Sequence, residues 1–287
     1  MKHLHRFSFA ASAAALACAL AAPAHAQSFD AALASVTKGL TIKAGIGHIS
    51  PHSTSSDITG TQPVGGGSTA SFPVPAGNHL TVQPKSTFVL SFERAINDNV
   101  SVELVLGAPP IHDVKLSVGH ETRDAASKVE LLQGIVGATG GMASPFFESL
   151  VGAQVAKNVV SFDGAAISKA RQMAPTMFVN YKFGTPSSTL RPFVGLGVNL
   201  TTFKATSTPA GVAALNDGPL SIKLSNSVGA AAQAGVAYRI DDHWSLNAAW
   251  TIVQVKSEMV ATTAHSVQRA TFRSTPTAFL ATVGYSF

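Results

Sequence analysis

Period-two alternation of apolar and polar residues is the feature that most constrains how this chain folds. It recurs in eight windows: Leu40–Ile46, Phe88–Phe92, Val100–Leu106, Met177–Phe183, Val194–Leu200, Val228–Tyr238, Trp244–Ile252 and Phe279–Phe287. In each window one face is apolar and carries neither a charge nor a side-chain amide. The alternate positions include Lys43, Glu93, Glu103, Lys182 and Arg239. Such windows read as strands that separate two environments.

The arrangement of these faces favours a membrane protein. A water-soluble barrel would place its apolar face inside, whereas charges at the alternate positions place the polar face inside here. In lipid every backbone N–H needs a partner, and a closed barrel supplies one without leaving edges. The sequence therefore predicts an all-β fold, an eight-stranded antiparallel transmembrane β-barrel.

The N-terminus predicts export. Lys2 and Arg6 precede the apolar stretch Phe9–Ala22, and an A-x-A pattern ends at Ala26. This pattern is typical of a secretory signal peptide over 1–26, cleaved after Ala26; an uncleaved anchor is the alternative. We then expect a periplasmic segment over 27–37 and the barrel over 38–287, in which no apolar run reaches the length of a transmembrane helix.

The lengths of the connections predict which end of the barrel faces out. Three short, turn-rich links follow strands, at 97–99, 185–189 and 241–243. Four long segments alternate with them, at 50–84, 109–172, 205–224 and 257–275. Outer-membrane barrels have short periplasmic turns and long extracellular loops. The second long segment carries a predicted insertion with helical stretches, about 119–172, read as an extracellular decoration or as a cap or plug over the mouth.

Aromatic residues gather near the predicted short-turn end, as an interfacial girdle does. They are Tyr181, Tyr238, Trp244, Tyr285 and Phe287. The final strand ends at Phe287 and resembles the terminal strand that the outer-membrane insertion machinery recognises. Charged residues make up only 12% of the chain and its basic residues are scattered. That excludes a nucleic-acid binder and predicts outer-membrane lipid as a partner.

Five segments resemble the OmpW/AlkL family of outer-membrane proteins, in the family's order over roughly 38–287. They are the opening strand GLTIKAGIGHISP (39–51), the hairpin NDNVSVEL (97–104), PIHDV (110–114), APT (174–176) and LRPFVGLGVN (190–199). The last is similar to the family pattern R-P-Y-V-G-x-G-x-N. The segment 109–172 departs from the pattern because it is much longer. The resemblance implies passive transport of small hydrophobic molecules across the outer membrane of a Gram-negative cell, by a porin-like barrel without cofactors.

The inward residues sort by depth into two sets. A polar floor near the short turns combines acids and bases that can pair with one another: Lys43, Glu93, Glu103, Lys182 and Arg239. An apolar cup lies toward the long segments: Val89, Val105, Phe178, Phe203, Val253, Val255 and Leu280. The cup is read either as core packing of a narrow barrel or as a site for hydrophobic solutes, whose crossing of a charged floor is costly.

A blocked floor predicts a lateral exit into the bilayer. Proline donates no backbone hydrogen bond and weakens strand pairing. Pro109 and Pro110 end the third strand, and Pro175 begins the fourth at the same height. We therefore expect an opening between these strands, which a Pro175→Val substitution should narrow.

The sequence also bears on three other functions. The spacing of His48, His52, His112 and His120 with Asp57 and Asp113 matches no zinc pattern, so no metal is predicted. His112 and His120 have Ser117 and Ser127 nearby but no recognisable catalytic motif, so no enzyme is expected. A structural or adhesive, receptor-like barrel with a packed lumen remains the alternative to transport.

Overall fold

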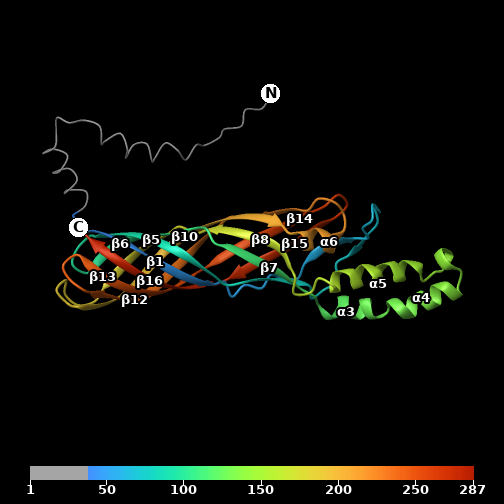
Figure 1. Ribbon diagram of the computed structural model, residues 1–287, viewed down its shortest axis with the longest axis horizontal. Helices are drawn as coiled ribbons and strands as arrows, with labels where there is room; N and C mark the ends of the chain where they lie inside the picture. The colour runs from blue at the N-terminus through green and yellow to red at the C-terminus, as the bar shows by residue number, and fades with distance from the viewer. Residues whose placement is uncertain (1–37) are drawn as a thin grey trace, which may run out of the picture.

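The computed structural model describes residues 38–287, so the predicted signal peptide and the segment 27–37 lie outside the described residues. Eight antiparallel strands form one closed barrel (Figure 1). In their order around the wall they are β12 (Ser227–Arg239), β13 (Trp244–Val253), β16 (Thr277–Ser286), β1 (Leu40–Ser50), β5 (Lys85–Ala95), β6 (Val100–Gly107), β9 (Thr176–Lys182) and β10 (Leu190–Ser207). Pairing of β10 with β12 closes the ring. The predicted eight-stranded barrel is confirmed.

The outer face of this barrel is apolar, as the alternation predicts. Phe88 and Leu196 each leave 74% of their surface exposed, whereas Ser91 and Asn180 on the opposite face are buried. Exposing apolar surface to water costs about 25 cal/mol per Å². A continuous band of such residues is therefore stable only against hydrocarbon, and this face is the lipid contact of the barrel.

The short turns are held by side chains that mimic backbone acceptors. Asn97 Oδ1 accepts hydrogen bonds from the N–H groups of Asn99 and Val100, at 3.0 and 2.8 Å. Asp241 Oδ1 accepts from the N–H groups of Trp244 and His243, at 2.7 and 2.8 Å. These hydrogen bonds hold the pKa of the Asp241 carboxyl below its usual value.

Aromatic rings gather at the same end. Tyr285 packs edge-on against Trp244 and against Phe287, with ring centroids 5.0 Å apart in both pairs. Tyr238 is paired with Leu190 and Leu246 beside the turns. Half-exposed aromatic rings at one level of a barrel mark a membrane–water interface.

At the opposite end the wall continues as further sheet. Its strands are β2 (Thr59–Pro63), β3 (Ser71–Pro73), β4 (His79–Val82), β7 (Ile111–Ser117), β8 (Ala166–Met173), β11 (Ser221–Leu224), β14 (Val255–Thr262) and β15 (Val267–Ser274). They enclose an apolar core that includes Leu80, Leu116, Met259 and Phe272. The four long segments, predicted as loops, thus contribute strands to this sheet, because their inward residues bury one another above the membrane.

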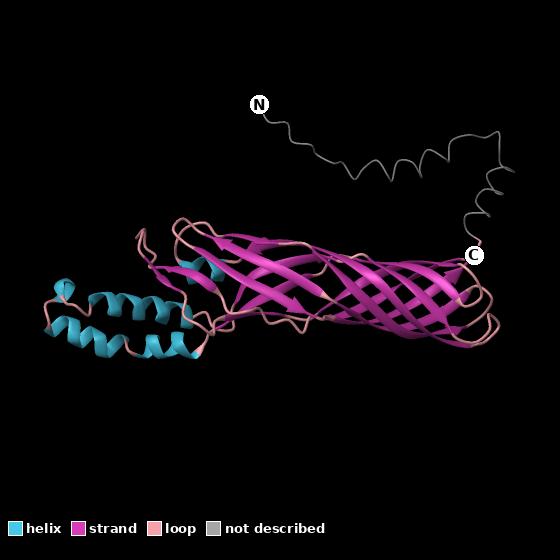
Figure 2. Ribbon diagram, turned by 180° about the vertical axis from the view of Figure 1, so that it is seen from behind, coloured by secondary structure: helices cyan, strands magenta, loops and turns pink. Residues whose placement is uncertain are grey.

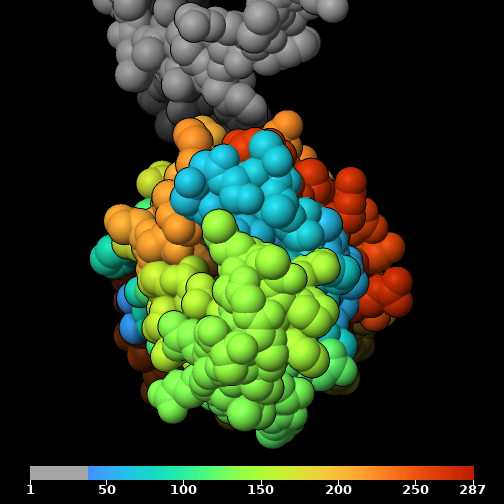
Figure 3. Space-filling view, turned by 90° about the vertical axis from the view of Figure 1, so that its right-hand side faces the viewer, coloured from blue at the N-terminus to red at the C-terminus, as the bar shows by residue number. Residues whose placement is uncertain are grey.

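The helices belong to the second long segment, apart from α6 (Pro209–Leu215). α3 (His120–Ser127), α4 (Val129–Ala138) and α5 (Phe147–Val160) form a hairpin that projects beyond the end of the barrel (Figure 2). Seen end-on, the helices and the β2–β3 region cover this end of the molecule (Figure 3). The predicted insertion to 172 is therefore helical only to Val160, since β8 returns to the wall. Across residues 38–287, no helix is long and apolar enough to span a membrane.

Candidate functional site

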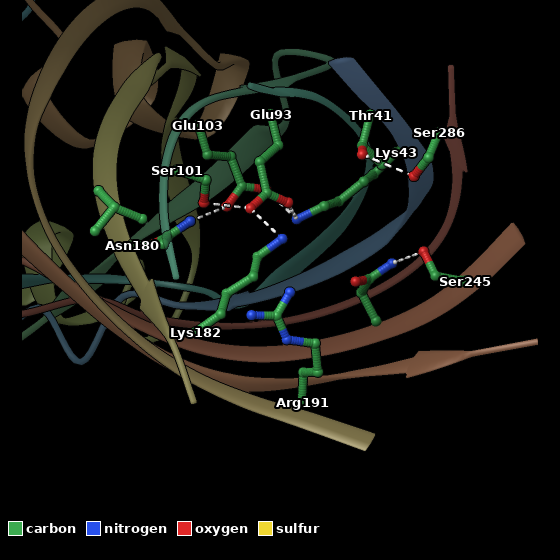
Figure 4. Close-up of polar contacts among 12 residues, drawn as sticks. Thr41, Lys43, Glu93, Ser101, Glu103, Asn180, Lys182, Arg191, Ser245 and Ser286 are labelled. Atoms are coloured by element: carbon green, nitrogen blue, oxygen red, sulfur yellow. Dashed lines mark hydrogen bonds and ion pairs between the residues drawn. The ribbon is translucent and has the colours of Figure 1, made fainter. Parts of the chain in front are cut away.

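A buried ion-pair network crosses the lumen near the short turns (Figure 4). Lys43 Nζ lies 2.7 Å from Glu93 Oε2 and 2.8 Å from Glu103 Oε1. Lys182 Nζ lies 2.5 Å from Glu93 Oε1. The network joins β1, β5, β6 and β9, and its two cations balance its two carboxylates. A neutral, tightly paired set of charges is the arrangement that a low-dielectric interior tolerates.

Neutral side chains complete the hydrogen bonding of this floor. Glu103 also accepts hydrogen bonds from Ser91 Oγ at 2.7 Å, Asn180 Nδ2 at 2.8 Å and Gln233 Nε2 at 3.0 Å. Ser101 Oγ donates to Glu93 Oε1. These four residues are not among the floor residues that the sequence predicts. Their inward parity and polar character were the available signal, but only the register shows that they reach the carboxylates.

Arg239 is the exception among the predicted floor residues. Its guanidinium donates to the Ser187 carbonyl oxygen and lies 3.8 Å from Asp242 Oδ1, with 40% of the side chain exposed. Its position in the last pair of the β12–β13 register places it at the rim, where a long side chain reaches water. The floor therefore consists of Lys43, Glu93, Glu103 and Lys182 with their neutral partners.

An apolar cavity of about 110 Å³ lies above the floor. Six of the predicted cup residues line it: Val89, Val105, Phe178, Val253, Val255 and Leu280. Phe203, the seventh, lines a second cavity of about 60 Å³. The two cavities share Gln172, Val255 and Pro276, so they follow one another along the lumen. For scale, a cavity of roughly 150 Å³ lined by apolar side chains holds one benzene molecule.

The barrel wall has an unpaired stretch beside the first cavity. Pairing of β6 with β9 ends at Val105 and Thr176. Pairing between the two sides of the wall resumes farther from the floor, where Gln172 N–H donates to the Pro110 carbonyl oxygen, at 3.0 Å. Within the described chain, no backbone hydrogen bond joins 106–109 to 173–175. Gly107 and Ala174, within this stretch, and Pro110, at its border, also line the cavity.

The three prolines predicted at this opening have different roles. Between β6 and β9 the Lys182 N–H donates to the Asn99 carbonyl oxygen. Hydrogen-bonded and non-hydrogen-bonded pairs alternate in an antiparallel ladder, so this one bond determines which residues of β9 bond to β6. That alternation turns the backbone of Pro175 away from β6, and its carbonyl oxygen accepts from Leu200 N–H of β10 at 3.0 Å. The donor that Pro175 lacks therefore faces β10, contrary to the sequence interpretation of that residue.

Pro110 is the residue that removes a donor at the unpaired stretch. Its carbonyl oxygen accepts from Gln172, but its ring nitrogen has no hydrogen to return to Gln172. Pro109 lies within the unpaired stretch itself. The unpaired stretch thus ends above at Pro110 and Gln172, which make one of the two possible hydrogen bonds, and below at Val105 and Thr176, the last pair of β6 with β9.

The histidines considered as metal ligands lie apart from one another. His48 contacts Ser86 Oγ at 3.0 Å, and His52 contacts Thr277 Oγ1 at 3.1 Å. His112 contacts the Gln83 carbonyl oxygen at 2.8 Å. In the described part of the chain, no three His, Cys, Asp or Glu side chains are grouped as metal ligands.

The closed barrel, its apolar outer face and its aromatic belt define a transmembrane β-barrel protein of the outer membrane. A family model described as the OmpW family matches residues 146–287. This match covers just under half of the chain and makes it similar to the OmpW family, whose members are outer-membrane barrel proteins and not enzymes.

Individual relatives agree with this assignment. The chain is 25% identical over 251 residues to outer membrane protein W of Vibrio cholerae, covering 86% of this chain and 87% of that protein. It is 31% identical over 123 residues to outer membrane protein W of Escherichia coli K12, covering 42% of this chain and 56% of that protein. Its fold is similar to the crystal structure of OprG from Pseudomonas aeruginosa, with a TM-score of 0.62, 20% identity and coverage of 88% and 97%.

Proposed function

We propose that this barrel is a passive conduit for small hydrophobic molecules, which enter the apolar lumen from the outer end and leave sideways into the bilayer. The observation that carries the proposal is the position of the apolar cavity. It lies directly between a closed ionic floor and a stretch of wall without strand pairing.

The floor makes passage straight through the barrel unfavourable. An apolar solute would have to separate Lys43 from Glu93 and Glu103 and leave buried charges without partners. Breaking a buried ion pair costs about 3–5 kcal/mol. The unpaired stretch offers a route that breaks no strand hydrogen bond, because none is present between its two sides.

The lipid side of the opening is also apolar. Met173 and Met177 flank it on one side and Ile111 lies above it, and all three expose much of their side chains. Gly107 faces the lumen by strand parity yet is exposed, as expected for a residue at the edge of a hole. A solute leaving here passes from an apolar cavity to the apolar side chains of these methionines.

The proposal is tested by uptake into outer-membrane vesicles with and without the barrel, using an apolar probe and a polar probe of similar size. Faster entry of the apolar probe alone supports the conduit. Equal entry of both probes with and without the barrel favours the alternative, a packed structural or receptor barrel.

The position of the exit is tested by substitutions. Gly107→Leu places a side chain in the opening, where a Cβ at residue 107 has ordinary contacts of 3.6 and 3.8 Å. Pro110→Val supplies the missing donor to Gln172. Both should slow uptake of the apolar probe, whereas Pro175→Val, whose new donor faces β10, is the matched control. A loss in Pro175→Val as large as that in Gly107→Leu would contradict this exit.

A further inference from the structure

His112 is a buried polar side chain of the lumen, on the far side of the first cavity from the ionic floor. It lies on β7, is 1% exposed and lines the second cavity together with Val114, Ala170, Phe203 and Phe272. A core that needed only packing would carry an apolar side chain at this position, because a buried polar atom without a partner is unfavourable.

The hydrogen bonding of the ring fixes its protonation pattern. Nδ1 lies 2.8 Å from the Gln83 carbonyl oxygen, and because a carbonyl only accepts, Nδ1 carries the proton. Burial lowers the pKa of His112 below its usual value, which favours the neutral ring. In a neutral ring protonated at Nδ1, the distal nitrogen Nε2 holds a lone pair and acts only as an acceptor.

That distal acceptor has no partner. Nε2 is buried and makes no hydrogen bond to any residue in 38–287. A second such atom is Thr251 Oγ1, on β13, which is also buried without a partner and lines the first cavity. Two neighbouring apolar cavities therefore each hold one unsatisfied polar atom, which is the lining expected for a ligand that is mostly apolar with a polar group.

We propose that His112 Nε2 is a recognition point for apolar solutes that carry one hydrogen-bond donor, an aromatic or aliphatic alcohol or a similarly small N–H compound. The inference rests on the conduit proposed above and names its substrate class. The solute's O–H or N–H donates to Nε2 while its hydrocarbon part contacts Val114, Ala170 and Phe203. A purely apolar solute of the same size leaves Nε2 without a partner and therefore gains less.

Benzyl alcohol and anisole provide a matched pair of probes, since they are isomers and only benzyl alcohol has a donor. The variant His112→Asn keeps a donor for the Gln83 carbonyl near the Nδ1 position and removes the distal acceptor. The control is His48→Asn, an exposed histidine of β1 outside both cavities.

Two measurements separate this inference from the conduit itself. The first is vesicle uptake: we expect His112→Asn to slow benzyl alcohol by roughly two- to tenfold, the range of one hydrogen bond, and to leave anisole unchanged. The second is the ¹⁵N resonance of His112 Nε2 in the full-length protein in bilayers, which should shift with benzyl alcohol and not with anisole.

The outcomes are distinct. If the Nε2 resonance shifts with neither probe, the recognition point is refuted, whatever the uptake shows. Equal slowing of both probes in His112→Asn also overturns it, because the substitution then acts on the lumen and not on the donor. An Nε2 resonance that responds to benzyl alcohol in a barrel that takes up neither probe supports the binding site and refutes the conduit.

Discussion

Replacing Lys43 with methionine tests whether the floor is held by paired charges. Lys43 is 4% exposed and contacts both Glu93 and Glu103 within 3 Å. After the substitution Glu93 keeps Lys182, whereas Glu103 keeps only neutral hydrogen-bond donors and becomes a buried charge without a cation. Removing one partner of a buried ion pair costs about 3–5 kcal/mol, which is roughly two to four powers of ten in the folding equilibrium.

The loss is measured by urea unfolding of the refolded barrel in bilayers, followed by the fluorescence of the chain's two tryptophans, Trp244 and Trp250. The matched control is Arg239→Met. Arg239 is a basic residue near the same end, at a position that alternation places on the lumen face of its strand. Its ion pair is exposed and should contribute less than about 1 kcal/mol to the free energy of unfolding. Equal losses in the two variants would refute the pairing argument.

A double substitution separates charge from shape. Lys43→Met combined with Glu103→Gln leaves Glu93 and Lys182 as a balanced pair and removes the charge that has lost its cation. We expect the double variant to be more stable than Lys43→Met alone, a coupling expected only for residues that interact. Additive losses would show that Lys43 acts through packing, for example against the Phe193 ring 5.8 Å from its Nζ.

Two further predictions concern the wall and the outer loops. Gly197→Ala should prevent barrel formation, because a Cβ at residue 197 would lie 2.2 Å from the Met177 carbonyl oxygen. The control Gly134→Ala should fold, because residue 134 has open space around it. Folding is measured by the gel shift of the refolded barrel. Asp217 clamps the loop at His265, and its hydrogen bonds to Thr263 and His265 lower its pKa from 3.8 to about 2. The hydrogen bonds of Asp217 therefore contribute their full stability above about pH 4, and this stability is lost as the pH falls through about 2. Amide exchange of the loop should become faster over this pH range. The Asp217→Asn variant should not show this pH dependence.

The barrel itself was predictable because lipid leaves few alternatives. Alternation such as that of Val194–Leu200, with an uncharged face, has one stable solution in a membrane, a closed ring of strands. The same physics fixed the apolar exterior and the aromatic belt around Trp244 and Tyr285. Above the membrane this constraint disappears, so the sequence alone does not distinguish the segments that form β7, β8, β14 and β15 from loops.

Membership of the lumen site depended on register and depth. Alternation placed Lys43, Glu93, Glu103, Lys182 and Arg239 on one face, and it could not show that Arg239 reaches water while the other four meet. Distances across a barrel follow from how its strands are staggered, which is a property of the closed ring and not of any one strand.

The unpaired stretch of the wall shows the same division. Proline in the sequence located a weak point in the wall, since the lack of an N–H is a property of the residue alone. The alternation of hydrogen-bonded and non-hydrogen-bonded pairs, which only the structure shows, makes Pro110 the residue that lacks a donor at this stretch. The same alternation directs the backbone of Pro175 toward β10. Likewise the sequence contained His112, but the unpartnered Nε2 exists only because the fold buries that ring and gives its other nitrogen to Gln83. The sequence alone determines the chemistry of each residue. The closed barrel determines which groups contact one another and which are left without partners.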